Sequence, residues 1–542
     1  MMRSALLLTP ALLLAQALLP AGAAAQACAR PAELRSYDLT GPAAELARAL
    51  SSTHFSDARG SGIFRSSVRG VGVCLDSLSF LAGWSTAGPV RDGVEAAPVQ
   101  LRVVGNSAYP RSVNDGLLWA GKGLGTVASG GVQGRWRMLS AALIPVAAHQ
   151  QNGDFPYVGS NRTGRSAFAN PDHGGIDLPK RHGEDAFSVV HPGQSFLRVD
   201  AGPVRAALST ENLWLGPAQV YPLLLSNSAP GFPHVRVGTS GPIDVWFADL
   251  ELNVFWGSVS ESDHFDGLTR NDHHLFTASS ITLEPRLLPG LHLGIARVYH
   301  DTLKATGQKL DFYVDRIAES PFWAGGGNRP GNAIGALHLR WVLPESGFEV
   351  YGEWAREDTP YDAEEVLREP DWTRTFAGGV QKVFVGPERL TRVYGELINL
   401  GASPATVFRG FFTTYTHSQA VHGHTHRGQM LGAGVGPGSD AQRVGADVFS
   451  AAAMTGGFIE RVRYDDDTYY RRFYRRFGES RHDVELSAGM RRLQRVGQLE
   501  VNAELVVSRR WDRDFLSLRT ESEETVEDNV HATLGVRWMP RF

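Results

Sequence analysis

The chain has 542 residues and a formal net charge of −4, and 20% of its residues are charged. This near balance gives no case for nucleic acid as a partner, because such surfaces need a clear excess of Lys and Arg. The 60 glycines and the aromatic content of 10%, without a mature apolar run long enough for a spanning helix, favour a large exported β-protein or an outer-membrane β-barrel.

The first 25 residues have the three parts of a secretory signal peptide. Arg3 supplies the positive start, residues 6–19 form an apolar run, and residues 23–25 are a small-residue cleavage site. The run is too short and too interrupted to span a membrane as a helix. We therefore expect export and removal of residues 1–25. A lipid anchor at Cys28 is the alternative, although the residues before it lack the usual Leu.

The two cysteines, Cys28 and Cys74, both lie near the expected mature N-terminus. Exported proteins mature in an oxidising compartment, so the sequence predicts one disulfide between them. In the chain-entropy model a loop of that size stabilises the fold by roughly 4 kcal/mol. Two free buried thiols are the alternative.

Residues 26–95 differ in pattern from the rest of the chain. Residues 43–50 form a short helical stretch after Pro42, which stands at a favourable helix-start position, and residues 71–81 form a second apolar segment. We predict a small, partly helical periplasmic region here, which plugs or braces the floor of a barrel spanning residues 96–542.

From about Pro98 onward the sequence alternates apolar with polar residues. Residues 499–507 are apolar at every odd position and mostly polar between them, and residues 337–343 and 348–354 repeat the pattern. Charged side chains on the second face suit a water-filled lumen better than a dry sandwich core, with the apolar face toward lipid.

The segment 530–542 is the clearest predicted transmembrane strand. Ala532, Leu534, Val536, Trp538 and Phe542 fall on one face, and His531, Thr533, Arg537 and Arg541 fall on the other. The segment is long enough for a tilted strand to cross a bilayer, and its final Phe resembles the C-terminal signature of outer-membrane proteins. A soluble edge strand would also alternate, but would not need to stop on an aromatic residue. The sequence thus predicts an all-β, transmembrane antiparallel barrel in the outer membrane of a Gram-negative (diderm) bacterium.

The spacing of turn signals orients the predicted strands, because bacterial barrels have short periplasmic turns and long extracellular loops. We place the short links at 201–202, 240–242, 288–290, 344–347, 386–390, 436–438 and 493–497. We place the extracellular loops at 146–193, 217–232, 258–273, 301–332, 357–373, 400–424, 461–480 and 509–529. We predict 18 strands in all, with 16 and 20 as alternatives.

The most distinctive sequence blocks are 210–217 and 224–234, which read TENLWLGP and LLSNSAPGFPH. With 114–123 and 193–200, they resemble in order and spacing the signature of the Wzi-type capsule-assembly proteins, over nearly the whole mature chain. Leu215 departs from it, since the family often has a second Trp there. The resemblance implies an 18-stranded outer-membrane barrel with a small helical N-terminal part. It also implies lectin-like binding that anchors or organises capsular polysaccharide at the cell surface.

The 210–234 block is the first candidate polysaccharide site. An aromatic ring can pack on the apolar face of a sugar while amide and carboxylate groups bind its hydroxyls. The candidate ligands are Glu211, Asn212, Trp214, Asn227 and His234. The alternative is a structural plug, in which Glu211 pairs with a lumen arginine such as Arg198 or Arg205 and Trp214 fills space.

Residues 461–481 form the second candidate site, with seven arginines among six aromatic residues. Arg forks pair with uronate carboxylates and aromatic rings stack on sugars, so this extracellular loop could bind an acidic polysaccharide. The candidate residues are Arg471, Arg472, Tyr474 and Arg475. Contact with lipopolysaccharide phosphates, or a lining of the barrel mouth, is the alternative.

Three histidines, His422, His424 and His426, would share one face of a strand about 7 Å apart, which is too far for one ion without a bend. The run 272–274 is a similarly weak candidate. We therefore predict no metal site and no cofactor.

Catalysis has little support in the sequence. Ser195 lies near His191, and Ser209 lies near Glu211, but neither pair has a nucleophile motif around it. We expect no enzymatic activity.

These observations favour a monomeric outer-membrane barrel that binds surface or capsular polysaccharide and contacts outer-membrane lipid and lipopolysaccharide. A porin for sugars or other small molecules is the alternative, because a barrel of this size has room for a lumen. An open lumen with a ladder of charges would support conduction, whereas a lumen closed by loops would support surface binding.

Overall fold

The computed structural model describes residues 31–540, apart from 37, 56–59, 67–68, 75–77, 85–91, 269–271, 303–330, 358–362, 407–411, 419 and 478–480. The predicted signal peptide, Cys28 and Phe542 therefore lie outside the described residues, and of Cys74 only the backbone is described. The predicted disulfide stays a prediction.

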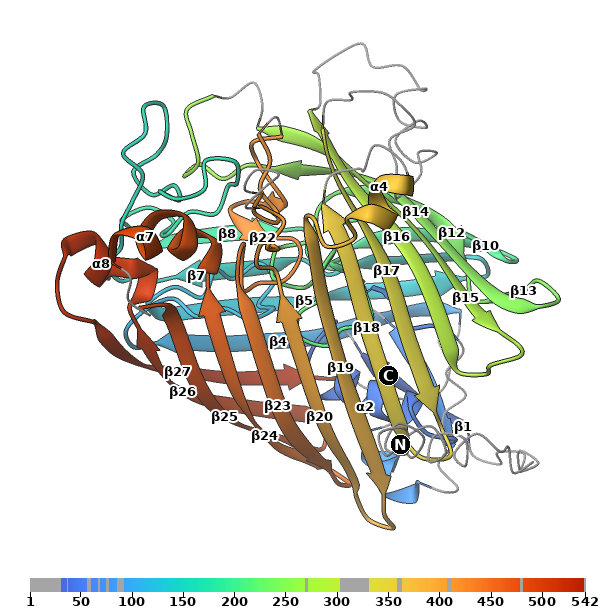
Figure 1. The fold of residues 1–542 in the computed structure, drawn as a ribbon. Helices are drawn as coiled ribbons and strands as arrows, with labels where there is room; N and C mark the ends of the chain where they lie inside the picture. The colour runs from blue at the N-terminus through green and yellow to red at the C-terminus, as the bar shows by residue number, and fades with distance from the viewer. Residues whose placement is uncertain are drawn as a thin grey trace, which may run out of the picture.

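The body of the protein is a closed antiparallel barrel of 18 strands, which confirms the predicted fold (Figure 1). Its first strands are β4 (Gly93–Asn106), β5 (Gly123–Trp136), β6 (Leu139–Leu143), β7 (Val146–Gln150), β8 (Phe187–His191), β9 (Phe196–Ala201), β10 (Val204–Ser209), β12 (His234–Thr239), β13 (Ile243–Asp244), β14 (Ala248–Ser260), β15 (His273–Pro285) and β16 (Leu291–Thr302). The remaining barrel strands are β17 (Asn332–Leu343), β18 (Phe348–Glu357), β19 (Arg374–Val385), β20 (Leu390–Asn399), β23 (Asp440–Phe449), β24 (Ala453–Tyr464), β25 (Asp483–Val496), β26 (Leu499–Trp511) and β27 (Val526–Trp538).

Some of these segments share one position in the barrel wall. Both β6 and β7 pair with β5, so they are two parts of one interrupted strand, and β8 and β9 continue as the next. Likewise β12 and β13 both pair with β14. The barrel closes where its last strand, β27, pairs with its first strand, β4, and we call this pairing the seam.

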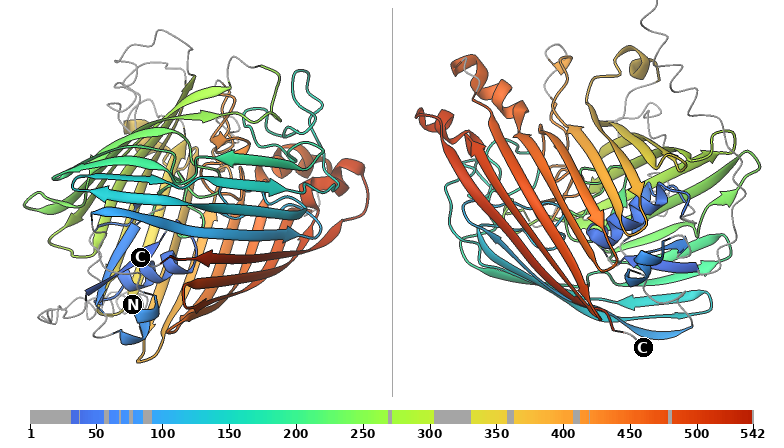
Figure 2. Two further views of the ribbon diagram at one scale, coloured as in Figure 1. Left: turned by 180° about the vertical axis from the view of Figure 1, so that it is seen from behind. Right: turned by 90° about the horizontal axis from the view of Figure 1, so that it is seen from below.

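The N-terminal region lies at the short-turn end of the barrel. It contains β1 (Pro31–Ser36), helix α2 (Pro42–Ser51), β2 (Phe64–Ser66), β3 (Arg69–Cys74) and the 3-10 turn η1 (Ser79–Gly83). Figure 2 shows α2 within the outline of the barrel when the molecule is seen from below. Leu46 and Leu50 of α2 pack with Phe449 and Leu493 of the wall, so this helix occupies the floor of the lumen.

The outer surface of the barrel is apolar, as the alternation predicts. In β27, Leu534 and Trp538 are about half exposed, whereas His531 is buried inside. Exposed aromatic side chains gather near the short turns, where Trp136 and Trp246 lie. Such a belt of outward apolar and interfacial aromatic residues is what a lipid bilayer requires.

Short turns lie at one end of the barrel and long loops at the other, as predicted. One predicted turn is wrong, because residues 436–438 lie inside the long loop 400–439 between β20 and β23. The true short turn is 450–452, which joins β23 to β24. The Gly-Pro-Gly run gave the stronger turn signal, whereas the Ser-Ala-Ala turn contains no glycine or proline. The error left the predicted directions of the other strands unchanged.

Two inward-folded segments, 213–232 and 413–435, fill much of the lumen; we call them the lumen plug. They contain β11 (Leu213–Leu215), β21 (Thr425–His426) and β22 (Gln429–Met430). Leu223 and Leu224 from the first segment and Leu431 from the second share one buried apolar cluster with inward side chains of the wall, including Phe255 and Phe276.

The long-loop end also carries short helical segments. They are α4 (Ala363–Arg368), α6 (Asp466–Thr468), the π-helical turn η3 (Tyr469–Phe473), α7 (Tyr474–Phe477), the 3-10 turn η4 (Arg513–Phe515) and α8 (Leu516–Thr520). Figure 1 places α7 and α8 side by side at this end. Among the described residues, no helix has the length and hydropathy of a membrane span.

Candidate functional site

The first predicted site is a tightly packed part of the lumen plug. Trp214 in β11 is fully buried, and its indole Nε1 donates a hydrogen bond to the carbonyl of Ala218 at 3.0 Å. The Arg65 guanidinium lies 4.6 Å from the centre of its ring, because β11 pairs with β2 of the N-terminal region. Trp214 therefore joins the lumen plug to the N-terminal region.

The neighbouring polar residues are also engaged with protein groups. Glu211 accepts a hydrogen bond from the Ser209 hydroxyl at 3.1 Å. Asn212 donates to the carbonyl of Ala229 at 2.7 Å and exchanges two further bonds with the side chain of Gln194. The imidazole Nδ1 of His234 bonds the carbonyl of Phe232 at 2.8 Å. All three predicted ligands are buried.

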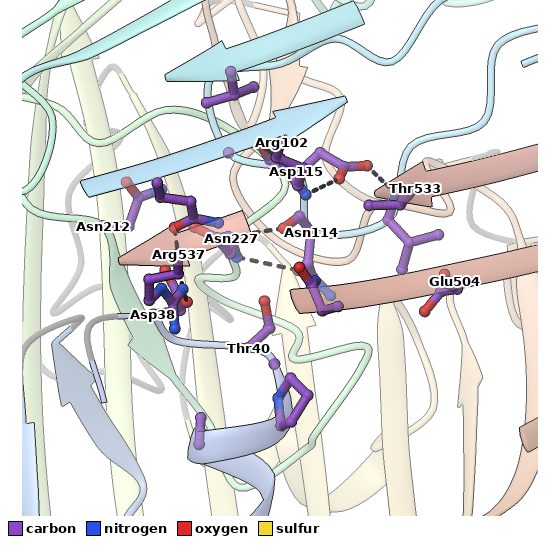
Figure 3. A pocket seen from close by; sticks show the side chains of 18 of the residues that line it. Asp38, Thr40, Arg102, Asn114, Asp115, Asn212, Asn227, Glu504, Thr533 and Arg537 are labelled. Atoms are coloured by element: carbon purple, nitrogen blue, oxygen red, sulfur yellow. Dashed lines mark hydrogen bonds and ion pairs between the residues drawn. The ribbon is translucent and has the colours of Figure 1, made fainter. Parts of the chain in front are cut away.

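Asn227 differs because it is only half buried. Its side-chain amide donates to the carbonyl of Asn114 at 2.7 Å, and its backbone N–H donates to Asn114 Oδ1 at 3.1 Å. Asn114 has a positive φ of 57°, which Asn tolerates better than most residues. Two blocks that are far apart in the sequence thus form one contact inside the lumen (Figure 3).

Asn212 and Asn227 border a lumen cavity of about 310 Å³. The cavity lies between the start of α2, the 111–117 loop and the inner faces of β4, β26 and β27. Its walls carry both signs of charge, with Arg102 bonded to Asp115 at 2.7 Å and Arg537 paired with Asp38 (Figure 3).

Apart from Asn212 and Asn227, none of the cavity residues named above was predicted as a site residue. The block around Asn114 and Asp115 supported only the family resemblance, although its residue types are typical of a polar loop beside a strand. Arg102 and Arg537 stand on the polar face of alternating strands, which is the available signal, but alternation does not show which polar residues converge.

The second predicted site is an exposed surface on η3 and α7. Six neighbouring side chains are exposed there, and we call them the Arg–Tyr surface: Tyr470, Arg471, Arg472, Tyr474, Arg475 and Arg476. Three of the four predicted residues are arginines with exposed side chains at the long-loop end. The guanidinium groups of Arg471 and Arg472 also donate to the backbone carbonyls of Asp172 and Pro171, respectively. The two predicted sites are therefore separate, one within the lumen and one on the outside.

Buried contacts hold the Arg–Tyr surface in place from below. Tyr469 and Phe473 alternate with the exposed residues and pack against Phe515 and Leu518. Asp172 forms an ion pair with Arg472 at 2.9 Å and accepts a hydrogen bond from Arg519 at 2.7 Å, which ties the surface to another loop. These cations hold the pKa of Asp172 below its ordinary value against the opposing effect of burial.

Asp467 lies in α6, just before η3. Its environment leads us to predict that the stability of the long-loop end depends on pH. Burial raises the pKa of Asp467 to about 7, while Asp467 Oδ1 accepts a bond from the N–H of Ala402 at 2.8 Å. A carboxyl whose pKa is raised by folding stabilises the fold at low pH. That contribution is lost as the pH rises from about 4 to 7, on the order of 1 kcal/mol per pH unit.

We expect Asp467→Asn to keep the bond to Ala402 and to remove this pH dependence. The measurement is hydrogen exchange of peptides spanning 400–406 and 465–468 between pH 5 and pH 8, corrected for intrinsic rates. In Asp467→Asn, the protection of these peptides should stay constant over this pH range. The turn 386–389 at the opposite end is the internal control. An identical pH dependence in both proteins would contradict the role of Asp467.

The closed barrel, its apolar outer belt and its aromatic rim define an outer-membrane β-barrel protein whose lumen is largely filled. A protein-family model described as "Capsule assembly protein Wzi" matches residues 122–520. The chain belongs to the Wzi capsule-assembly family, as its sequence blocks predict.

One solved structure agrees with this fold. The chain is similar to Wzi of Escherichia coli, described as an outer-membrane protein involved in group 1 capsule assembly and a carbohydrate-binding β-barrel. The identity is 12% and the TM-score 0.55, over 82% of this chain and 85% of that chain. It is also similar to OccK5 (OpdH) of Pseudomonas aeruginosa, at 10% identity and a TM-score of 0.39 over 84% and 100% of the two chains. The comparison with curated proteins gave no match.

Proposed function

We propose that this protein binds an acidic surface polysaccharide at the Arg–Tyr surface and so anchors it to the outer membrane. The polymer is bound and not chemically changed. The barrel acts as a monomer whose apolar belt contacts lipid and lipopolysaccharide.

The observation that carries this proposal is the composition and exposure of the Arg–Tyr surface. Guanidinium groups bind carboxylates through paired hydrogen bonds, and exposed tyrosines offer flat faces for sugar rings. Arg475 has no ion-pair partner within the described part of the chain, whereas Arg476 pairs with the exposed Glu521. A carboxylate on each repeat of a polymer could meet several of these cations in turn.

The filled lumen supports surface binding over conduction. The lumen plug packs apolar side chains against the wall, and α2 occupies the floor. A channel for sugars would need a continuous wet path, which apolar packing of this kind opposes. We therefore expect no steady channel current from the purified protein in planar bilayers.

Within this proposal, the 210–234 block has a structural role and does not bind sugar. Its donors and acceptors are matched by protein groups, and Trp214 has no exposed surface for a sugar to stack on. Asn227, at the cavity, is the member with partial exposure.

A glycan pull-down tests the proposal. We expect the triple variant Arg471→Gln, Arg472→Gln, Arg475→Gln to retain acidic polysaccharide at least about tenfold less well, since each charge-assisted bond contributes roughly 1.5–3 kcal/mol. Added salt should weaken the wild-type interaction. Arg368→Gln is the matched control, because Arg368 is an exposed arginine of α4 at the same end of the barrel. Equal retention by wild type and the triple variant would overturn the proposal.

A further inference from the structure

We propose that Glu261, His274 and His422 form a binding site for a divalent transition-metal ion, with zinc as the best match to this ligand set. The three residues come from different parts of the fold. Glu261 follows β14, His274 is in β15, and His422 belongs to the second segment of the lumen plug. This site does not depend on the proposed polysaccharide binding.

The geometry brings the three ligand atoms together. One carboxylate oxygen and one ring nitrogen from each histidine all lie within 4.8 Å of one another. Zinc bonds of about 2.0–2.2 Å in a tetrahedral arrangement place neighbouring ligand atoms roughly 3.4 Å apart. Small side-chain rotations would close the remaining distance. The two-residue spacing of His422, His424 and His426 does not reveal this arrangement, because the three proposed ligands come from different segments of the chain.

His422 is the residue that points to a ligand. Its side chain is fully buried, and neither ring nitrogen has a hydrogen-bond partner among the described residues. Native proteins rarely leave such a buried polar atom without a partner, because the loss of its hydrogen bonds to water is then not compensated. The backbone of His422 is nevertheless held firmly, because its carbonyl accepts bonds from Asp177 at 2.9 Å and Thr425 at 2.9 Å. Its ring lies 4.7 Å from that of His274, edge to face.

The adjacent histidines form other hydrogen bonds, so they are not ligands in the proposed site. His424 Nε2 donates to the carbonyl of Leu224 at 2.7 Å, so its Nδ1 is an acceptor for His300 Nε2 at 2.9 Å. His426 Nδ1 accepts from the N–H of Ser260 at 2.9 Å. These bonds assign a neutral tautomer to His424 and His426 and anchor the lumen plug.

The surrounding charges favour a cation. Asp177, Asp266 and Asp272 act electrostatically on Glu261, and Arg165 opposes them in part. Two imidazoles and one carboxylate are ligands that zinc prefers, while calcium and magnesium prefer oxygen alone. Three protein ligands leave a fourth position for water.

A metal ion here would fasten the lumen plug to the barrel wall. His422 lies on the plug, whereas His274 and Glu261 lie on the wall and in the loop that leaves it. Metal binding to a folded site stabilises that site by mass action. The site therefore links metal supply to closure of the lumen.

Metal analysis of the purified full-length protein tests this inference. After treatment with EDTA and dialysis, the wild type should take up one Zn²⁺ per chain, and Co²⁺ should give the visible absorption of a four-coordinate site. Glu261→Gln keeps the shape of the side chain, so we expect a folded barrel with at least tenfold weaker metal binding. His422→Gln should abolish binding, and His149→Gln, a change at an exposed histidine, should leave it intact.

Two results would overturn the proposal. One is a wild-type protein that takes up no Zn²⁺ or Co²⁺. The other is equal metal affinity in wild type, Glu261→Gln and His149→Gln, which would show adventitious binding. If His422→Gln does not fold, Glu261→Gln and the cobalt spectrum still decide the outcome.

Discussion

Replacing Glu349 with alanine is expected to detach α2 from the floor of the barrel and to lower the stability of the protein by about 3–5 kcal/mol. Glu349 in β18 is fully buried and accepts bonds from Arg48 of α2 at 2.9 Å and from Arg340 of β17 at 3.0 Å. Ser52 and Gln381 donate to the same carboxylate. Loss of Glu349 leaves two buried guanidinium groups without their counterion.

Two measurements check this expectation. The temperature at which the folded, fast-migrating band is lost on gels should fall, and trypsin should cleave after Arg48 more quickly. Changing Arg48 to methionine in the Glu349→Ala background should restore part of the stability, because it removes one uncompensated charge. Asp528→Asn is the matched control, since the Arg509–Asp528 pair is exposed and solvent screening leaves exposed pairs with little effect on stability. Unchanged unfolding of Glu349→Ala would contradict the anchoring role.

Trp214→Ala should cost about 3–5 kcal/mol, as for other large core residues, by leaving a cavity between the lumen plug and β2. The hydrogen bond to Ala218 and the contact with Arg65 are lost together. We expect lower thermal stability and faster proteolysis of residues 60–66, because their pairing with β11 is weakened.

Polysaccharide retention separates the two interpretations of Trp214. Below the unfolding temperature, Trp214→Ala should retain acidic polysaccharide within about twofold of the wild type, because the Arg–Tyr surface is unchanged. Trp214→Phe should recover most of the stability. An intact, stable barrel that no longer retains polysaccharide would instead assign Trp214 to the glycan.

The barrel was predictable from the sequence because alternation repeats along every strand and the turn residues mark most of its boundaries. The turn at 450–452 was not predicted because its sequence, Ser-Ala-Ala, contains no glycine or proline. Burial was harder to predict. The residues Glu211, Asn212 and His234 suit sugar binding by type, yet their partners Ser209, Ala229 and Phe232 are protein groups that only the folded chain reveals.

The sequence also did not reveal which residues from different loops lie together. The Arg–Tyr surface is local in sequence, so composition alone could select it. Glu261, His274 and His422 are brought together by an inward-folded loop, and no spacing rule applies to residues that far apart.

The filled lumen also bears on the order of assembly in the membrane. The seam is closed by β27 and β4 along eight residue pairs, whereas β26 and β27 pair along thirteen. Helix α2 and the lumen plug are held inside by buried ion pairs and an apolar cluster. We expect these contents to pack before the shorter β27–β4 pairing forms, so that the barrel closes around a lumen that is already filled.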